Sequence, residues 1–140
     1  MAETIKYPSR LVIFVHKEFK KLIEKTEKDR DALAVVLFGS YVRKESFSDV
    51  DVCIVLKPKR FTHLYLSSKR LRYSIAFPNL DIQIFQQLPL PIKMRILKEG
   101  KVIFCKDEDA LYDLAFSTIR EFELFKPRYL SYLEGVLHAG

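Results

Sequence analysis

The chain has little of the chemistry that marks secreted or zinc-binding proteins. Its 140 residues include two cysteines and three histidines. Cys53 and Cys105 each lie inside an apolar run typical of a strand and lack CxxC spacing, so we expect buried small hydrophobic side chains. The histidines are far apart in the sequence and form no zinc-ligand pattern, which disfavours a structural zinc site. They are His16, His63 and His138.

Long apolar runs are also missing. No run approaches the roughly eighteen residues that a helix needs to cross a bilayer, and the first ten residues lack the apolar region of a signal peptide. The length suits one compact domain over residues 1–140, and a hydrophobic fraction of 49% is enough to fill its core. We therefore expect a soluble, cytoplasmic protein without membrane contact.

The charge balance is basic. A formal net charge of +6 and a pI near 9.3 suit a polyanionic partner such as a nucleoside triphosphate, RNA or an acidic protein surface. Many of the lysines fall on an expected helix at residues 10–28, where a solvated face explains them equally well. The charge therefore leaves direct nucleic-acid binding open.

Hydrophobic periodicity predicts alternating helices and strands. The expected elements are a helix (10–28), a strand (32–38), a short helix or turn (41–45), a strand (50–56), a helix (62–76), a strand (80–85), a helix (89–97), a strand (102–105) and a final helix (108–137). Pro127 should kink or split that last helix. The order predicts an α/β (α+β) layer with a helical tail at about 108–138.

Two acidic residues begin the second expected strand. Asp49 and Asp51 are two positions apart, so their side chains should point to the same face and can share divalent cations. The spacing alone is common by chance, and the alternative interpretation is an acidic strand start on the surface.

The surroundings of these residues favour a functional role. Gly39 and Ser40 follow a buried strand, where glycine permits close backbone approach and free N–H groups with a hydroxyl can hold a phosphate. Asp81 should face away from the aliphatic side of its own strand. If that strand lies beside the one that carries Asp49 and Asp51, three carboxylates meet, as two-metal phosphoryl transfer requires.

These motifs resemble a known superfamily. The stretch LFGSYVRKESFSDVDVCIV resembles the signature of the DNA polymerase β-like nucleotidyltransferases, whose Gly-Ser precedes Asp-x-Asp. The resemblance implies a mixed sheet flanked by helices. The later stretch LDIQIFQQLPLPIKMRILKEGKVIFCKD is similar to the corresponding region of the minimal members. The tail EFELFKPRYLSYLEGVL is similar to the helical end of MntA-type antitoxins, whose partners are small helical HEPN-domain ribonuclease toxins.

The resemblance also implies roles for individual residues. Gly39 and Ser40 would contact the triphosphate of ATP. Asp49 and Asp51 would bind Mg²⁺, and Asp81 would be the third catalytic and metal-binding carboxylate. Members of the MntA type transfer AMP from ATP to a tyrosine of the cognate HEPN toxin, so the expected partners are ATP and such a toxin.

The loop between the two motifs departs from the family pattern. Family loops commonly read Gly-Ser-x-Ala-Arg-Gly, whereas this chain has Val42 and then Lys44 in place of the second glycine, and the loop is about two residues short. Arg43 is retained and is the preferred phosphate contact. Lys93 and Arg95 are further candidates by charge, although each is equally consistent with a surface cation.

Three functions therefore remain in view. The first is an AMP-transferring enzyme that modifies a HEPN toxin. The second is an antitoxin that neutralises its toxin by binding alone, since the glycine-poor loop departs from the family pattern. The third is a nucleotidyltransferase acting on a small molecule or RNA, which normally requires additional substrate-binding domains.

Overall fold

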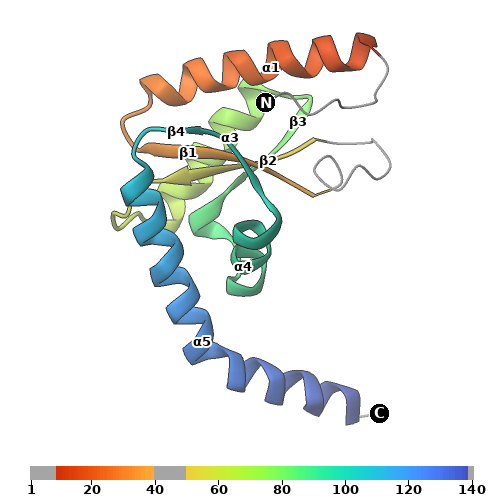
Figure 1. The fold of residues 1–140 in the computed structure, drawn as a ribbon, viewed down its shortest axis with the longest axis vertical. Coiled ribbons are helices and arrows are strands. Elements are labelled where there is room, and N and C mark those ends of the chain that lie inside the picture. The colour runs from red at the N-terminus through yellow and green to blue at the C-terminus, as the bar shows by residue number, and fades with distance from the viewer. Residues whose placement is uncertain (1–8, 40–49, 139–140) are drawn as a thin grey trace.

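A single sheet forms the centre of the fold, with helices on both of its faces (Figure 1). The computed structural model describes residues 9–39 and 50–138, with side chains described from residue 17 onward in the first of these ranges. The sheet has four strands in the order β3-β2-β1-β4. The strands are β1 (Ala32–Phe38), β2 (Val50–Leu56), β3 (Leu80–Ile84) and β4 (Lys101–Cys105).

The sheet is mixed, which confirms the expected fold class. β1 runs antiparallel to both β2 and β4, whereas β2 and β3 are parallel. The crossover between the parallel strands is α3 (His63–Ala76), at the position that the sequence predicts. Thr62 caps its start as expected, because its hydroxyl accepts a hydrogen bond of 3.1 Å from the backbone N–H of Tyr65.

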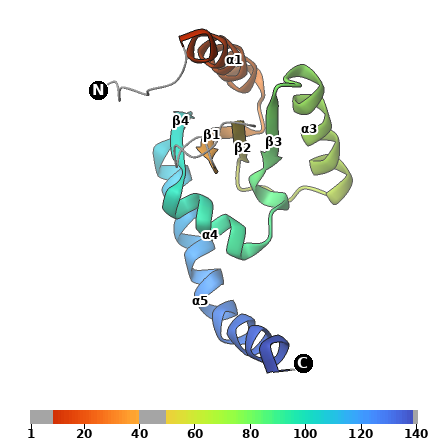
Figure 2. The same ribbon diagram turned by 90° about the vertical axis from the view of Figure 1, so that its right-hand side faces the viewer.

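The helices divide between the two faces of the sheet (Figure 2). α1 (Ser9–Lys28) and α3 pack on one face, whereas α4 (Leu90–Glu99) and α5 (Glu108–His138) pack on the other. β2 shows the division clearly, since Val52 and Ile54 belong to the first core and Cys53 and Val55 to the second. Alternate residues of a central strand therefore face different helices, which explains its continuous apolar sequence.

α3 buries a different face from the one that its leucines suggest. The helical pattern at 62–76 rests on four aliphatic residues, yet Leu64, Leu71 and Ile75 are 77%, 60% and 71% exposed. The buried residues are Leu66, Lys69 and Tyr73. Sequence periodicity predicts this helix correctly and its orientation wrongly, because Lys69 and Tyr73 are held inward by polar partners.

The third strand ends one residue earlier than expected. The predicted strand at 80–85 stops at Ile84, and a 3₁₀ turn, η1 (Phe85–Gln87), follows. The side-chain amide of Gln86 replaces the missing strand pairing. It accepts a 3.0 Å hydrogen bond from the N–H of Leu56 and donates one of 2.7 Å to the carbonyl of the same residue.

α5 is continuous through Pro127, so of the two expected outcomes, a kink or a split, the helix is not split. Figure 1 shows the helix changing direction in its lower part and extending away from the sheet, as expected for a proline-bent helix. Its first half packs against α4 and the sheet through Ala110, Leu111 and Leu114. Its second half extends beyond the core.

The cysteines occupy strands, as expected. Cys53 is fully buried and Cys105 is partly buried, and neither forms a disulfide. Burial raises the pKa of the Cys53 thiol, so it is unreactive at neutral pH. Within residues 9–39 and 50–138, no helix is both long enough and apolar enough to span a membrane.

Candidate active site

The end of β1 delivers Gly39 against a carboxylate of β2. Phe38, the last residue of β1, pairs with Asp51 in the antiparallel register. Gly39 follows with a φ of +76°, a left-handed conformation that favours glycine. A Cβ atom at this position would lie 2.0 Å from Oδ2 of Asp51. Only glycine therefore allows the Asp51 carboxylate to lie directly against the backbone here.

β3 brings Asp81 alongside Asp51. The parallel register of β2 and β3 makes these two residues direct partners. Neighbouring strands are separated by roughly 4.8 Å, and partnered side chains share one face of the sheet. Asp81 is exposed, and its Oδ1 lies 3.3 Å from Nε2 of Gln83, which donates a hydrogen bond to it. The strands are thus neighbours, as the proposed carboxylate cluster requires.

Three of the predicted site residues lie outside the described part of the chain. They are Ser40, Arg43 and Asp49, together with the expected short helix or turn at 41–45. Their roles remain predictions. Asp51, Asp81 and Gly39 are the predicted site residues that the structure brings together.

α4 forms the far wall of a hollow beside this carboxylate. The residues that line the hollow come from β1, β2 and α4, and they are Phe38, Gly39, Asp51, Ile92, Arg95, Ile96 and Glu99. Nε of Arg95 lies 3.4 Å from Oε2 of Glu99, and both side chains are about half exposed. The hollow therefore contains two carboxylates and one guanidinium among its lining residues.

Sequence reasoning did not assign Glu99 to this site. The α4 residues of the hollow have i, i+3, i+4, i+7 spacing, so they occupy one helical face. That spacing is visible in the sequence, but the packing of α4 against the end of β1 is not. Lys93 does not line the hollow, because its Nζ lies 5.5 Å from the centre of the Phe85 ring instead.

The site suits a hard divalent cation. Mg²⁺ prefers oxygen ligands and is commonly held by one or two carboxylates together with substrate phosphates. Asp51 and Asp81 supply such oxygens on one face of the sheet. Among the described residues no group of three or more histidine, cysteine, aspartate or glutamate side chains is close enough to hold a metal. The predicted third carboxylate, Asp49, is not among those residues.

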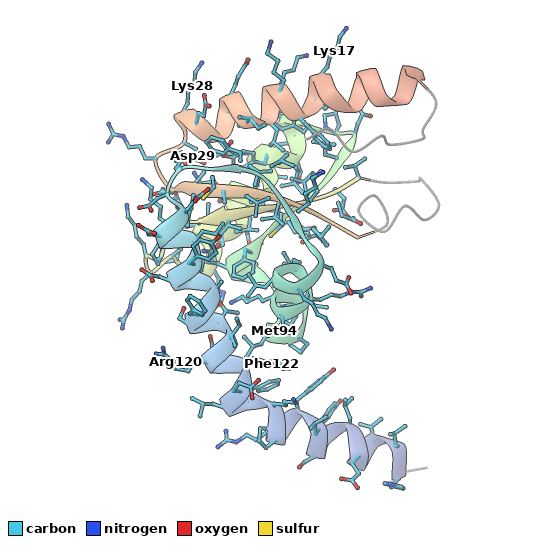
Figure 3. The ribbon with its side chains drawn as sticks, viewed as in Figure 1. Lys17, Lys28, Asp29, Met94, Arg120 and Phe122 are labelled. Carbon is cyan, nitrogen blue, oxygen red and sulfur yellow. The ribbon has the colours of Figure 1, made fainter. Side chains whose placement is uncertain are left out.

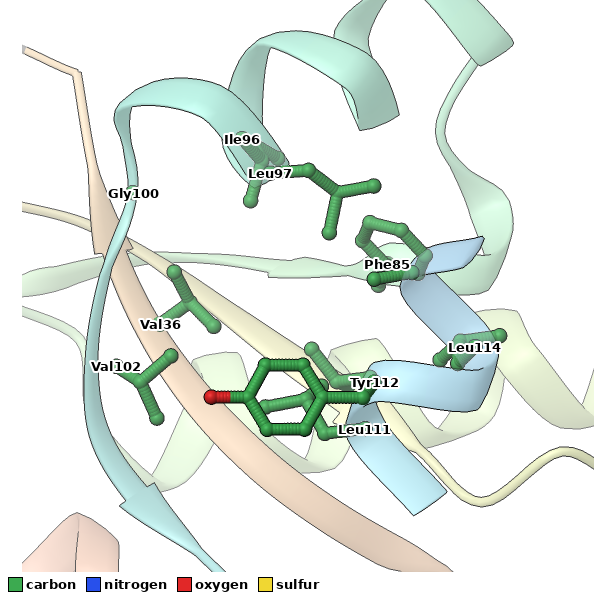
Figure 4. Close-up of a pocket in the computed structure, with 11 residues that line it drawn as sticks. Val36, Phe85, Ile96, Leu97, Gly100, Val102, Leu111, Tyr112 and Leu114 are labelled. Carbon is green, nitrogen blue, oxygen red and sulfur yellow. The ribbon is translucent and has the colours of Figure 1, made fainter. Parts of the chain in front are cut away.

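A second pocket lies between the sheet and the helices α4 and α5 (Figure 4). Its lining is apolar, with Val36, Phe85, Leu97 and Leu114 among its side chains, and the Tyr112 ring lies at its edge. None of the described residues that line it is charged. A triphosphate needs charged or N–H partners, so the hollow at Asp51 is the better nucleotide site.

A partly buried polar cluster lies at the start of β1, beyond the end of α1 (Figure 3). Lys69 of α3 donates hydrogen bonds of 3.0 and 2.9 Å to the carboxylate of Asp29, and the Tyr73 hydroxyl donates one of 2.7 Å. The Tyr65 hydroxyl bonds to Asp31. No described side-chain polar atom is buried without a partner. Because the groups satisfy one another, this cluster fixes α3 to the turn before β1.

The pKa values in the cluster reflect this pairing. Burial alone would raise the pKa of the Asp29 carboxyl, but hydrogen bonds from Lys69, Tyr73 and the Asp31 backbone together hold it below its usual value. Burial would lower the pKa of Lys69, yet Asp29 and Tyr65 hold it above its usual value. Both groups are therefore charged at neutral pH.

Comparison with known proteins places the chain in a family. A family model described as "Polymerase beta, Nucleotidyltransferase" matches residues 20–109, which include all the predicted site residues. The chain is 42% identical over 72 residues to a protein of Methanocaldococcus jannaschii named "Putative protein adenylyltransferase". The match covers 50% of this chain and 53% of that protein, so the chain spans about half the length of this relative.

Solved structures share the fold. One chain of a toxin-antitoxin complex with AMP-PNP superposes with a TM-score of 0.65 at 15% identity, over 86% of this chain and 97% of that chain. A chain from the tri-AMPylated HEPN toxin of Shewanella oneidensis in complex with MNT antitoxin gives 0.61 at 15% identity, over 86% and 94%. The fold and the family match agree, and the chain belongs to the polymerase β nucleotidyltransferase family.

Proposed function

We propose that the chain is a magnesium-dependent nucleotidyltransferase that moves AMP from ATP to a tyrosine of a helical HEPN toxin. The observation that carries this proposal is the pairing of Asp51 with Asp81 on neighbouring strands, beside the hollow that Gly39 lines. Two carboxylates next to an accessible backbone suit a metal-bound nucleotide. Membership of the nucleotidyltransferase family supplies the reaction class.

Each residue has one task in the proposed reaction. The backbone at Gly39 and the hydroxyl of Ser40 hold the phosphates. Asp49 and Asp51 hold Mg²⁺, which when bound neutralises phosphate charge and lowers the pKa of an attacking hydroxyl. Asp81 completes the carboxylate set and receives the tyrosine proton. The tyrosine oxygen bonds to the α-phosphorus while the bond to the β-phosphate breaks, and pyrophosphate leaves.

The relatives support the choice of nucleotide and acceptor. The Methanocaldococcus jannaschii relative is named as a protein adenylyltransferase. One similar structure holds AMP-PNP, and another contains an AMPylated HEPN toxin with its MNT antitoxin. AMP transfer to such a toxin is therefore proposed for this chain by analogy with proteins of the same fold.

The second half of α5 is suited to a protein acceptor. Its large apolar side chains are exposed, and those of Leu124, Tyr132 and Leu137 are 78%, 67% and 80% accessible. Phe125, Tyr129, Tyr132 and Val136 are spaced alternately by four and three residues, the spacing that packs one helix against another. A small helical toxin fits this surface, which here has no partner among the described residues.

A second candidate function is neutralisation by binding alone. The loop sequence favours it, because Val42 and Lys44 occupy positions around which family members commonly have alanine and glycine. A glycine-poor loop cannot easily adopt a positive φ there. Under this alternative the α5 surface binds the toxin and the carboxylates transfer nothing.

The two functions can be distinguished by following labelled phosphate from ATP to the acceptor protein. We would incubate the full chain with Mg²⁺, the protein encoded by the neighbouring gene, and ATP labelled at the α- or the γ-phosphate. The proposal predicts that only the α-label reaches the acceptor. Transfer of the γ-label would indicate a kinase instead. Tight binding without any transfer would favour neutralisation.

The matched variant is Asp49→Ala/Asp51→Ala. We expect it to bind the acceptor as the wild type does and to lose label transfer. Transfer that survives the double change would contradict the assignment of the metal site. Omission of Mg²⁺, with EDTA present, is the corresponding test of the metal and should abolish transfer by the wild type.

A further inference from the structure

The described lining of the hollow at Asp51 carries charges of both signs. Of its seven described residues, Asp51 and Glu99 carry negative charge and Arg95 carries positive charge. A triphosphate brings several negative charges, which the two carboxylates would repel in the absence of a cation. We propose that Arg95 of α4 binds the β- and γ-phosphates of ATP, a role that rests on the proposed function.

The backbone geometry supports the position of the phosphates. Gly39 lines the same hollow and has a φ of +76°. Backbone N–H groups at the end of a strand can contribute to anion binding, which is the role that the proposed function gives to this backbone. Arg95 lines the same hollow from α4. A guanidinium suits this role because its fork of N–H donors matches phosphate oxygens.

Glu99 contacts the Arg95 guanidinium beside the hollow. The 3.4 Å contact between Nε of Arg95 and Oε2 of Glu99 spans one helical turn. Both side chains are about half exposed, so the pair contributes little to stability. Arg95 can therefore exchange this contact for a phosphate at small cost, and its removal should leave the fold intact.

The other candidate cations of α4 are placed differently. Lys93 lies over the Phe85 ring. Lys98 is exposed and does not line the hollow. The structure thus distinguishes Arg95 from neighbours that carry the same charge, and Lys98 provides a matched control on the same helix.

The test measures equilibrium binding of ATP and AMP, with Mg²⁺, to the full chain and its variants. We expect Arg95→Ala to weaken ATP binding about tenfold, as for the loss of one charge-assisted hydrogen bond, and to leave AMP binding within about threefold because AMP lacks the outer phosphates. Arg95→Lys should fall between Arg95→Ala and the wild type. Lys98→Ala should bind both nucleotides as the wild type does.

Two results would overturn the assignment. ATP binding by Arg95→Ala at wild-type strength would show that Arg95 only balances the neighbouring carboxylates. An equal loss of ATP and AMP binding would place its effect away from the outer phosphates. A wild type that binds no ATP would remove the proposed function and this role together, whereas an unaffected Arg95→Ala in an ATP-binding protein removes this role alone. Thermal melting of each variant separates lost binding from lost folding.

Discussion

At the scale of single residues, the site depends on a glycine that no other residue can replace. Gly39 combines a φ of +76° with a position where a Cβ atom would meet the Asp51 carboxylate at 2.0 Å. The sequence indicates this position because glycine ends a buried strand just before serine. It does not show that the neighbouring atom is the carboxylate of Asp51.

Gly39→Ala should therefore damage stability and activity together. The left-handed backbone costs a non-glycine residue about 1–2 kcal/mol, and the added methyl group displaces Asp51. We expect a lower midpoint in urea unfolding and loss of nucleotide transfer. Ala34→Gly, a change in the strand that precedes Gly39, is the control for general weakening of β1, and it should lower stability while retaining transfer. Full activity in Gly39→Ala would contradict the close approach of the Asp51 carboxylate to the backbone at Gly39.

The two carboxylates should be catalytic and dispensable for folding. Asp51→Asn and Asp81→Asn keep the side-chain size and remove the charge. Loss of outer contacts to a metal ligand typically costs 10–100-fold, so we expect transfer to fall at least about 100-fold in each variant. Steady-state transfer rates at saturating Mg²⁺ provide the measurement. Gln83→Asn, beside Asp81 on β3, should have a far smaller effect, and a similar fall there would argue against a specific role for Asp81.

At the scale of elements, the cluster around Asp29 holds α3 to the start of the sheet. Lys69 is 9% exposed and its partner carboxylate is nearby at 2.9 Å. Lys69→Met removes the ammonium and leaves Asp29 partly buried with fewer partners. Breaking a fully buried pair costs about 3–5 kcal/mol. Because Asp29 is only partly buried, urea unfolding should show a loss below that figure and above that of a surface change. Lys98→Met on α4, where the side chain is exposed, should change stability by less than about 0.5 kcal/mol.

The same cluster predicts how stability depends on pH. Because the pKa of Asp29 is lower in the folded state, its contribution is fully present above the usual carboxyl pKa of about 4 and is lost as the pH falls through the folded value. We expect stability to decline on acidification below about pH 4. Urea unfolding measured from about pH 2.5 to about pH 6 gives the free energy of unfolding as a function of pH. Asp29→Asn should flatten its acid limb, and an unchanged limb would contradict the assignment.

The second half of α5 should act in binding and not in folding. Tyr132→Asp/Val136→Asp places charges on the apolar stripe, where the side chains are 67% and 56% exposed. Exposed substitutions usually change stability by less than about 0.5 kcal/mol, whereas charges in an interface centre can cost 2 kcal/mol or more, roughly 30-fold in affinity. Affinity for the partner protein should fall accordingly. Ser131→Asp, on the other side of the helix, is the matched control and should bind normally.

Much of the element order could be predicted from the sequence, and the orientation of elements could not. The apolar runs at 32–38 and 50–56 predict β1 and β2 at their observed bounds because strands buried on both faces are continuously apolar. Leucines at helical spacing predict α3 but not its buried side. A lysine and a tyrosine line that side, and their pairing with Asp29 depends on contacts 40 and 44 residues apart in the chain.

The candidate site likewise has a part that could be predicted from the sequence and a part that could not. The shared face of Asp51 and Asp81 could be predicted because strand alternation fixes the side on which each residue lies, and the β2–β3 register places them opposite one another. The role of α4 could not be assigned, since Arg95 and Glu99 resemble a common surface pair until the helix is packed beside Gly39.

At the scale of the whole molecule, the candidate site and the uncovered apolar surface lie on different elements. The hollow beside Asp51 lies between the sheet and α4, whereas the uncovered apolar stripe lies on the part of α5 that extends away from the sheet (Figure 1). A protein that modifies another protein needs both a reacting centre and a docking surface. The proposed function assigns the first to the hollow and the second to α5, so variants should disable one without the other.

The central claim is that the carboxylates at Asp51 and Asp81 direct AMP transfer to a partner protein. The most direct test is the intact mass of the neighbouring-gene product after its coexpression with the wild-type chain or with Asp51→Asn. The wild type should add the mass of one or more AMP groups to a tyrosine of the partner, and Asp51→Asn should add none while still copurifying with it. An unmodified partner in complex with the wild type, or a modified partner with Asp51→Asn, would contradict the claim.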